Sequence, residues 1–234
     1  MMHTERNAYM PRLLLAGATI LTVAGVVIAV RAQAPATQPR PDAKSIVFRG
    51  DRFKPLTWNE MTPAQKTMVE HPVAGPRAGA NGPFNVLLRS PEMGDIAQQF
   101  GASMRFNSSI PPKLNEMAII ITARFWTSQY EWYAHHRAAL TAGLSPAIAD
   151  AIAAGKRPTG MQKDEETVYT FCTEILNTKH VSDATFKMTK DAFGEKGVVD
   201  LIGVMGYYDL VSMVLNVDRY PLPQGTQPAF PEPK

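Results

Sequence analysis

The sequence predicts an all-α fold of about seven or eight helices. Three observations predict it: apolar residues recur at helical spacing, capping residues or prolines stand before most of these segments, and no two segments alternate as paired strands do. The chain has 234 residues, of which 45% are hydrophobic and 19% charged. This length and composition are sufficient for one well-buried core.

The first 34 residues have a character of their own. A basic start is followed by an uncharged apolar run over 13–30, then by Arg31 and a small-x-small site. This is the pattern of a secretory signal, and the run is also just long enough to span a bilayer. We therefore expect residues 1–34 to be a signal peptide, cleaved after Ala34 or Ala36, which makes the mature protein periplasmic or secreted. The alternative is a membrane anchor formed by residues 13–30.

Charge excludes one class of partner. Removing residues 1–34 takes away Arg6, Arg12, Arg31 and Glu5, so the net charge falls from +3 to +1. The remaining chain is nearly neutral and has no basic run, which argues against a nucleic-acid partner. A membrane is a partner only if the N-terminal segment stays uncleaved.

Proline-rich segments flank the expected helical domain. Residues 35–54 are rich in proline and charge and are expected to form a linker. Residues 224–234 form a proline-rich tail that is expected to be extended or disordered. The helical domain is therefore expected over residues 55–223.

The first helices are marked by their capping residues. Thr62 and Pro63 predict an N-cap and a first helical position. Residues 71–83 are rich in Gly and Pro and are expected to form a loop. A short helix and a longer one should follow, separated by a break at Ser90 and Pro91.

The second half contains the most apolar segments. We expect two long apolar helices, 112–128 and 197–217, at the centre of the core. A helix ending at Gly143 follows the first of these, because glycine suits the position after a helix. The other expected helices are 146–155, 163–176 and 182–194. The single cysteine, Cys172, lies in an apolar segment and is expected to be buried.

Acidic and imidazole side chains gather in one window. Glu131 and His135 are four residues apart, so they share one helix face, and Ser128 joins that face if the helix extends back to it. A short connection near Thr127 would bring Glu116 of the preceding helix toward them. A carboxylate beside an imidazole is a proton-transfer pair. The alternative is a surface ion pair.

This window, residues 111–144, carries a family resemblance. The residues that carry it are Glu116, Arg124, Tyr130-Glu131-Trp132-Tyr133-Ala134-His135, Ala138-Ala139 and Gly143-Leu144. The chain resembles the carboxymuconolactone decarboxylase family, whose relatives include the alkyl hydroperoxidase D type of peroxidase. The resemblance covers roughly residues 55–223. It implies an alkyl hydroperoxidase D-like helical domain that assembles into homo-oligomers, trimers or hexamers.

One departure from the family excludes a chemistry. In the hydroperoxidase branch, a C-x-x-C pair precedes the histidine, and its places here are taken by Ser128 and Glu131. Cys172 is far away in sequence and has no partner. Thiol peroxidase chemistry needs a thiolate and a resolving thiol, so we do not expect it here.

The decarboxylase branch implies a cofactor-independent reaction. Such an enzyme removes CO₂ from a carboxylated enol-lactone, whose carbonyl serves as the electron sink, and protonates the resulting carbon. The resemblance implies that His135 is the general acid or base and that Glu131 orients it. Glu116 would shape the proton network, or would itself donate a proton if burial raised its pKa. Because export separates this chain from a cytoplasmic pathway, we expect another small carboxylated or lactone-like substrate.

Four further residues are candidates for binding that substrate. Arg124 would hold a carboxylate as a bidentate fork, or would instead pair with Glu116. Tyr130 and Trp132 would form pocket wall or core, and Ser128 is a further candidate.

Two other classes of function remain open. Glu116, Glu131 and His135 would suit a Zn²⁺ ion if they converged, although we assign no metal and no cofactor. The chain would otherwise be an exported oligomeric binding protein without catalysis.

Overall fold

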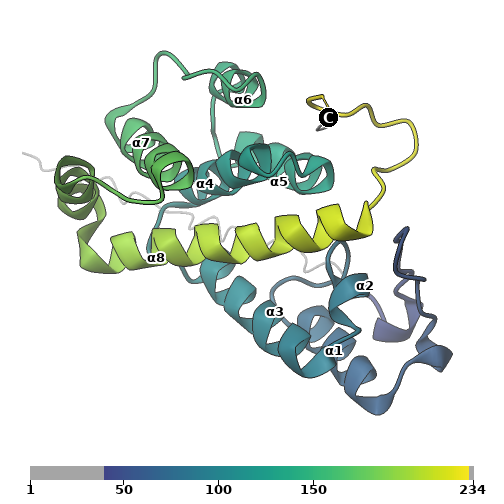
Figure 1. The fold of residues 1–234 in the computed structure, drawn as a ribbon. Helices are drawn as coiled ribbons and strands as arrows, with labels where there is room; N and C mark the ends of the chain where they lie inside the picture. The colour runs from purple at the N-terminus through teal and green to yellow at the C-terminus, as the bar shows by residue number, and fades with distance from the viewer. Residues whose placement is uncertain (1–39, 232–234) are drawn as a thin grey trace, which may run out of the picture. The chain divides into compact units, whose positions relative to one another are not determined.

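The computed structural model describes residues 40–231, and over this range the protein is all-helical, with eight α-helices and no strand (Figure 1). The predicted fold class is therefore confirmed. The predicted signal peptide or anchor, residues 1–34, lies outside the described residues. The helices are α1 (Pro63–Ala74), α2 (Phe84–Leu87), α3 (Pro91–Phe106), α4 (Pro112–Phe125), α5 (Gln129–Thr141), α6 (Pro146–Ala153), α7 (Lys163–Thr178) and α8 (Asp183–Asp218).

Helix ends follow the local signals in the sequence. The side chain of Thr62 accepts a hydrogen bond from the backbone N–H of Gln65, and Ser182 caps α8 in the same way. The two helices expected over 182–194 and 197–217 form one element, α8, broken at Gly194, whose φ of 70° and ψ of 177° are not helical. A glycine tolerates this conformation because it has no Cβ.

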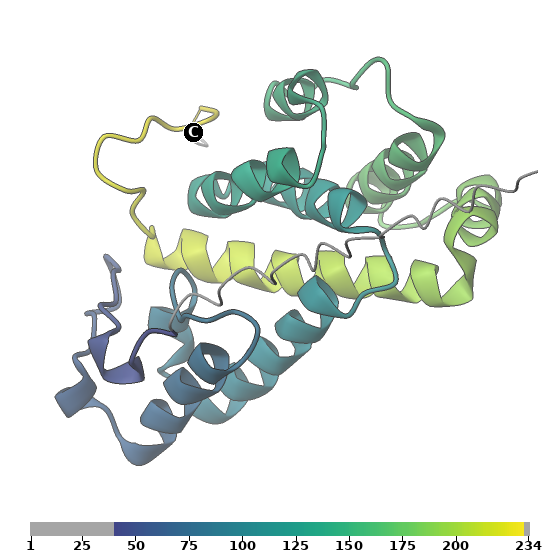
Figure 2. The ribbon, with the colours of Figure 1, turned by 180° about the vertical axis from the view of Figure 1, so that it is seen from behind.

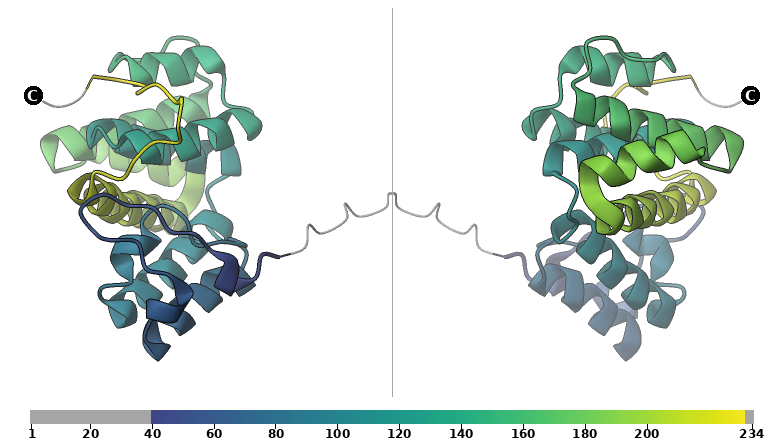
Figure 3. Two further views of the ribbon diagram at one scale, coloured as in Figure 1. Left: turned by 90° about the vertical axis from the view of Figure 1, so that its right-hand side faces the viewer. Right: turned by 90° about the vertical axis from the view of Figure 1, so that its left-hand side faces the viewer.

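The central position of α4 and of the second part of α8 is confirmed. Helix α4 packs against α5, α7 and α8, and its apolar side chains are almost entirely buried. Figures 1 and 2 show α8 crossing between α4–α7 on one side and α1–α3 on the other, and Figure 3 shows the same arrangement nearly end-on. Cys172 is buried and free, as predicted.

Within residues 40–231, α8 is the one helix long and apolar enough to cross a membrane, with a mean hydropathy of 1.6 over its most apolar window. However, 56% of that window is buried against the rest of the protein. A core helix meets the same criteria, so this feature is weak evidence for a membrane.

The described part of the expected linker is packed against the helices. Phe48 is 6% exposed, and the backbone N–H groups of Asp51 and Phe53 donate to Oδ1 of Asp218 at 3.2 and 2.9 Å. The buried carboxylate at the end of α8 thus holds this segment in place. The tail is also docked, because Phe230 packs edge-on against Trp132 with ring centroids 5.6 Å apart.

The expected loop at 71–83 begins later than its Gly and Pro content predicts. Helix α1 continues through Pro72 to Ala74, and the loop covers residues 75–83. Burial of Pro72 and Val73 in the core stabilises this last turn despite the proline.

Candidate active site

A tight reversal places α5 against α4. Helix α4 ends at Phe125, and Thr127 takes a left-handed φ of 49°. Ser128 is the N-cap of α5 and its N–H donates to the carbonyl of Ala123 at 2.9 Å. Ser128 therefore lies just outside the helix, and α5 does not extend back to it as the sequence had allowed.

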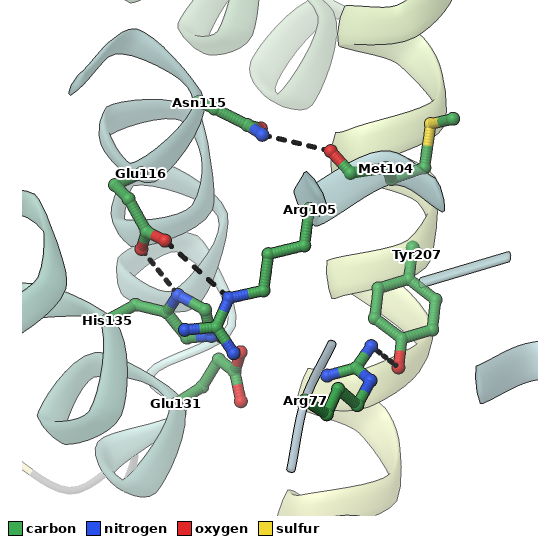
Figure 4. A network of polar contacts seen from close by, with 8 residues as sticks. All are labelled: Arg77, Met104, Arg105, Asn115, Glu116, Glu131, His135 and Tyr207. Carbon is green, nitrogen blue, oxygen red and sulfur yellow. Dashed lines mark hydrogen bonds and ion pairs between the residues drawn. The ribbon is translucent and has the colours of Figure 1, made fainter. Parts of the chain in front are cut away.

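The reversal brings Glu116, Glu131 and His135 together (Figure 4). Nδ1 of His135 lies 2.6 Å from Oε2 of Glu116, and Nε2 lies 3.1 Å from Oε1 of Glu131. His135 is 6% exposed and Glu131 3% exposed. The cluster is buried, so it is not a surface ion pair.

The charge of His135 follows from its surroundings. Burial acts to lower the pKa of His135, but the negative charge of Glu131 and the hydrogen bond with Glu116 outweigh burial and raise this pKa to about 9. The imidazole is therefore protonated at neutral pH, with a carboxylate facing each nitrogen. Such a group is a proton donor.

Helix α3 brings an arginine to the same cluster. Nδ2 of Asn115 on α4 donates to the carbonyl of Met104 at 2.9 Å, which ties the two helices together (Figure 4). The next residue on each helix is Glu116 on α4 and Arg105 on α3. These two side chains face each other, with Nε of Arg105 3.7 Å from Oε1 of Glu116. The arginine adds positive charge beside the imidazolium.

A cavity of about 220 Å³ opens beside this cluster. Its polar lining comes from the loop 75–83 and from α3, α5 and α8, and includes Arg77, Arg105, Tyr130, Glu131, His135, Tyr207 and Tyr208. Larger cavities lie elsewhere, but among the described residues this one unites the acid/base cluster with two arginines. Convergent charged groups in a concave site are what a small-molecule site requires.

Besides Nε of Arg77, two buried polar atoms in the cavity wall lack hydrogen-bond partners within residues 40–231. The hydroxyl of Tyr208 is one, and its ring packs edge-on against His135 with centroids 4.8 Å apart. Burial raises the pKa of Tyr208, so the hydroxyl keeps its proton. The other is Oε1 of Glu131, whose short approach to Nε2 of His135 lacks the angles of a hydrogen bond. Buried polar atoms left unpaired are typical of functional sites.

Arg124 lies outside this cavity, contrary to expectation. Its Nε donates to the carbonyl of Ala153 at 2.8 Å, and its guanidinium lies 5.0 Å from the ring centroid of Phe230. It lines a separate cavity of about 290 Å³ near α6 and α7. It neither pairs with Glu116 nor approaches His135, because its position near the end of α4 directs it toward α6.

The other expected binding residues are divided between sites. Tyr130 lines the cavity beside His135 and also a neighbouring cavity of about 510 Å³, which Ser128 lines too. Trp132 is buried and stacks on His136 with ring centroids 5.4 Å apart, away from His135. Tyr130 is thus the one of these three that lines the cavity beside the acid/base cluster.

Two arginines and two tyrosines of the cavity lining were not predicted: Arg77, Arg105, Tyr207 and Tyr208. One arginine lies in a loop and the other near the end of α3, and neither has a motif around it. The tyrosines lie in a helix whose apolar sequence predicts only core packing. No local pattern in the sequence distinguishes them.

The candidate zinc ligands do not converge on an open position. Both imidazole nitrogens of His135 face carboxylate oxygens, so neither is directed at a vacant coordination site. Within the part of the chain that the structure describes, no group of three or more His, Cys, Asp or Glu residues is spaced to hold a metal ion.

No protein-family model, curated protein or solved structure matches this chain.

Proposed function

We propose that this protein is an exported acid/base lyase of the decarboxylase type, acting on a small carboxylated or lactone-like substrate without a cofactor. One observation carries the proposal: a buried His135 lies between Glu116 and Glu131 at the wall of a small cavity, and these two residues raise its pKa to about 9. The resemblance of residues 111–144 to the carboxymuconolactone decarboxylase family supports the same chemistry.

The charge of the site favours an anionic substrate. With His135 protonated, the cavity and the acid/base cluster beside it hold three cations, His135, Arg77 and Arg105, and two carboxylates, Glu116 and Glu131. Together these five groups carry one net positive charge, which a carboxylate neutralises in a buried site where charge interactions are strong.

The reaction balances without an external oxidant or reductant. The bond between the substrate carbon and its carboxylate breaks, CO₂ leaves, and the electron pair is delocalised into the substrate carbonyl. Before the reaction, Glu131 and Glu116 stabilise the positive charge of the His135 imidazolium. His135 then gives its proton to the carbon, and solvent returns a proton to His135. A general acid of this kind contributes roughly 10²–10⁴-fold to rate.

The test is CO₂ release from carboxylated lactones and small keto or enol acids. We expect release by the protein, a loss of about 10²-fold or more in His135→Ala, and unchanged release in His180→Ala, a variant of an exposed histidine. No release across the panel would contradict the proposal and favour a non-catalytic binding protein. Release that persists in His135→Ala would contradict the role of His135 as the proton donor.

Thiol peroxidase activity, the family's other chemistry, is disfavoured. Ser128 and Glu131 occupy the places of the two cysteines. Cys172 is buried, and burial raises the pKa of its thiol, so little thiolate forms.

We also propose that the protein forms a homo-oligomer, a trimer or a hexamer. Ile96 and Phe100 on α3 and Val199 and Ile202 on α8 are exposed by 44–69%. They form an α3–α8 patch, since Phe100 approaches Gly203 next to Ile202. Exposed apolar patches of this kind are typical of subunit interfaces. Analytical ultracentrifugation should show the oligomer, and Ile202→Asp should dissociate it.

A matched control separates burial of this patch from a general effect of charge. Val47 is 81% exposed and lies outside the patch, so Val47→Asp should leave the oligomer intact. A monomeric native protein would contradict the proposal.

The proposed location is the periplasm or the exterior, with residues 1–34 removed as a signal peptide. Mass spectrometry of the protein recovered from its native host should find an N-terminus after Ala34 or Ala36. An intact N-terminus in the membrane fraction would instead support the anchor formed by residues 13–30.

A further inference from the structure

The loop 75–83 carries an arginine whose charge has no acidic partner among the described residues. Nη2 of Arg77 donates to the hydroxyl of Tyr207 at 3.1 Å, and its buried Nε has no hydrogen-bond partner within residues 40–231. The other two cations of the cavity differ, because Arg105 faces Glu116 and His135 lies between two carboxylates. A partly buried cation without a counterion is costly unless a ligand supplies one.

The surrounding packing fixes the position of this guanidinium. Cζ of Arg77 lies 5.7 Å from the ring centroid of Phe84 and 5.7 Å from that of Tyr207, which are cation–π distances. Tyr207 is 2% exposed and passes so close to α3 that a Cβ at Gly101 would lie 2.0 Å from its Cζ. Arg77 is therefore held in place at the cavity wall, as Figure 4 shows for its pairing with Tyr207.

Free hydrogen-bond donors remain on both residues. Tyr207 accepts from Arg77, so its own O–H remains to donate. Burial raises the pKa of Tyr207 although the charge of Arg77 opposes this, so the hydroxyl keeps its proton. Arg77 retains its Nε–H and further N–H groups. A planar guanidinium matches the two oxygens of a carboxylate.

We propose that Arg77, with the hydroxyl of Tyr207 beside it, binds the carboxylate of the ligand in the cavity that His135 lines. The proposal rests on the proposed function for the reaction, but the binding itself does not require turnover. The ligand is small, because the cavity of about 220 Å³ is below the range of about 300–1,000 Å³ typical of drug-sized sites. Arg77 thereby selects acids over neutral molecules of the same shape.

The test is calorimetric titration with pairs of short acids and their methyl esters. The acids are butyrate, levulinate, succinate and benzoate, at millimolar concentrations. We expect at least one acid to bind the full-length protein more tightly than its ester does. We expect Arg77→Met to weaken binding of that acid by about ten- to a hundredfold, and Arg77→Lys to weaken it less.

The ester is the control for structural damage, since a merely structural role of Arg77 would weaken acid and ester alike. Arg157→Met, which removes an exposed arginine paired with Glu166, should leave binding of the acid unchanged. Tyr207→Phe should weaken binding of the acid severalfold and leave that of the ester unchanged.

Two outcomes overturn the inference: no acid binds the protein, or Arg77→Met binds acid and ester as the parent protein does. Failure of the proposed function gives a different result. If acids bind through Arg77 but no substrate is turned over, the lyase is refuted and the binding site stands. If CO₂ release depends on His135 while Arg77→Met leaves KM and acid affinity unchanged, the lyase stands and the binding site is refuted.

Discussion

The buried imidazolium predicts that the stability of the protein depends on pH. The pKa of His135 is raised to about 9 in the folded protein, against an ordinary value of 6.5. Its contribution to the free energy of unfolding is therefore complete below pH 6.5 and is lost as the pH rises to about 9. At 1.36 kcal/mol per pKa unit, the rise corresponds to roughly 3 kcal/mol.

The perturbation is Glu131→Gln, which removes one negative charge and keeps the shape of the side chain. Burial has the largest effect on the pKa of His135 and lowers it. Among the effects that raise this pKa, the negative charge of Glu131 is the largest. Without that charge the pKa of His135 should fall. The variant should then lose less than the roughly 3 kcal/mol that the native protein loses between pH 6.5 and 9.

The assay is urea unfolding at half-unit pH steps, followed by circular dichroism. Glu70→Gln, which replaces an exposed glutamate on α1, is the control and should keep the native pH dependence. Burial raises the pKa of Cys172 and adds a loss above about pH 8.5 in every variant, so the comparison uses differences from the native protein. A native free energy of unfolding that is flat between pH 6.5 and 8.5, or equal slopes in native protein and Glu131→Gln, would refute the reasoning.

Three further outcomes follow from the packing. Gly101→Ala should lower the free energy of unfolding by about 1–3 kcal/mol in chemical denaturation, because its Cβ would lie 2.0 Å from Cζ of Tyr207. A change from Gly to Ala inside a helix usually raises this free energy by about 1 kcal/mol. Such a rise would contradict the close packing of Gly101 against Tyr207. Cys172 should react with a thiol reagent only after unfolding, and rapid reaction of the folded protein would disprove its burial. Asp218→Ala should cost about 1–3 kcal/mol and make the chain around Phe53 sensitive to proteolysis, since that segment loses its acceptor; an unchanged digestion pattern would mean that other contacts suffice.

Parts of the site that depend on one helix or on adjacent helices were accessible from the sequence. The four-residue spacing of Glu131 and His135 follows from helix geometry. The approach of Glu116, 19 residues before His135, needed only a tight connection, and the left-handed Thr127 provides it. Arg124 was misplaced because periodicity gives the face of a helix but not the helix that packs against that face.

The sequence by itself determined the helical fold, the capped starts at Thr62 and Ser182, and the burial of Cys172, because these depend on local conformational preference and apolar spacing. Only the tertiary structure decided that an arginine from the loop 75–83 lies against a tyrosine 130 residues later. Contacts at that separation depend on how the helices pack, through features such as the missing Cβ of Gly101, and no local pattern records them.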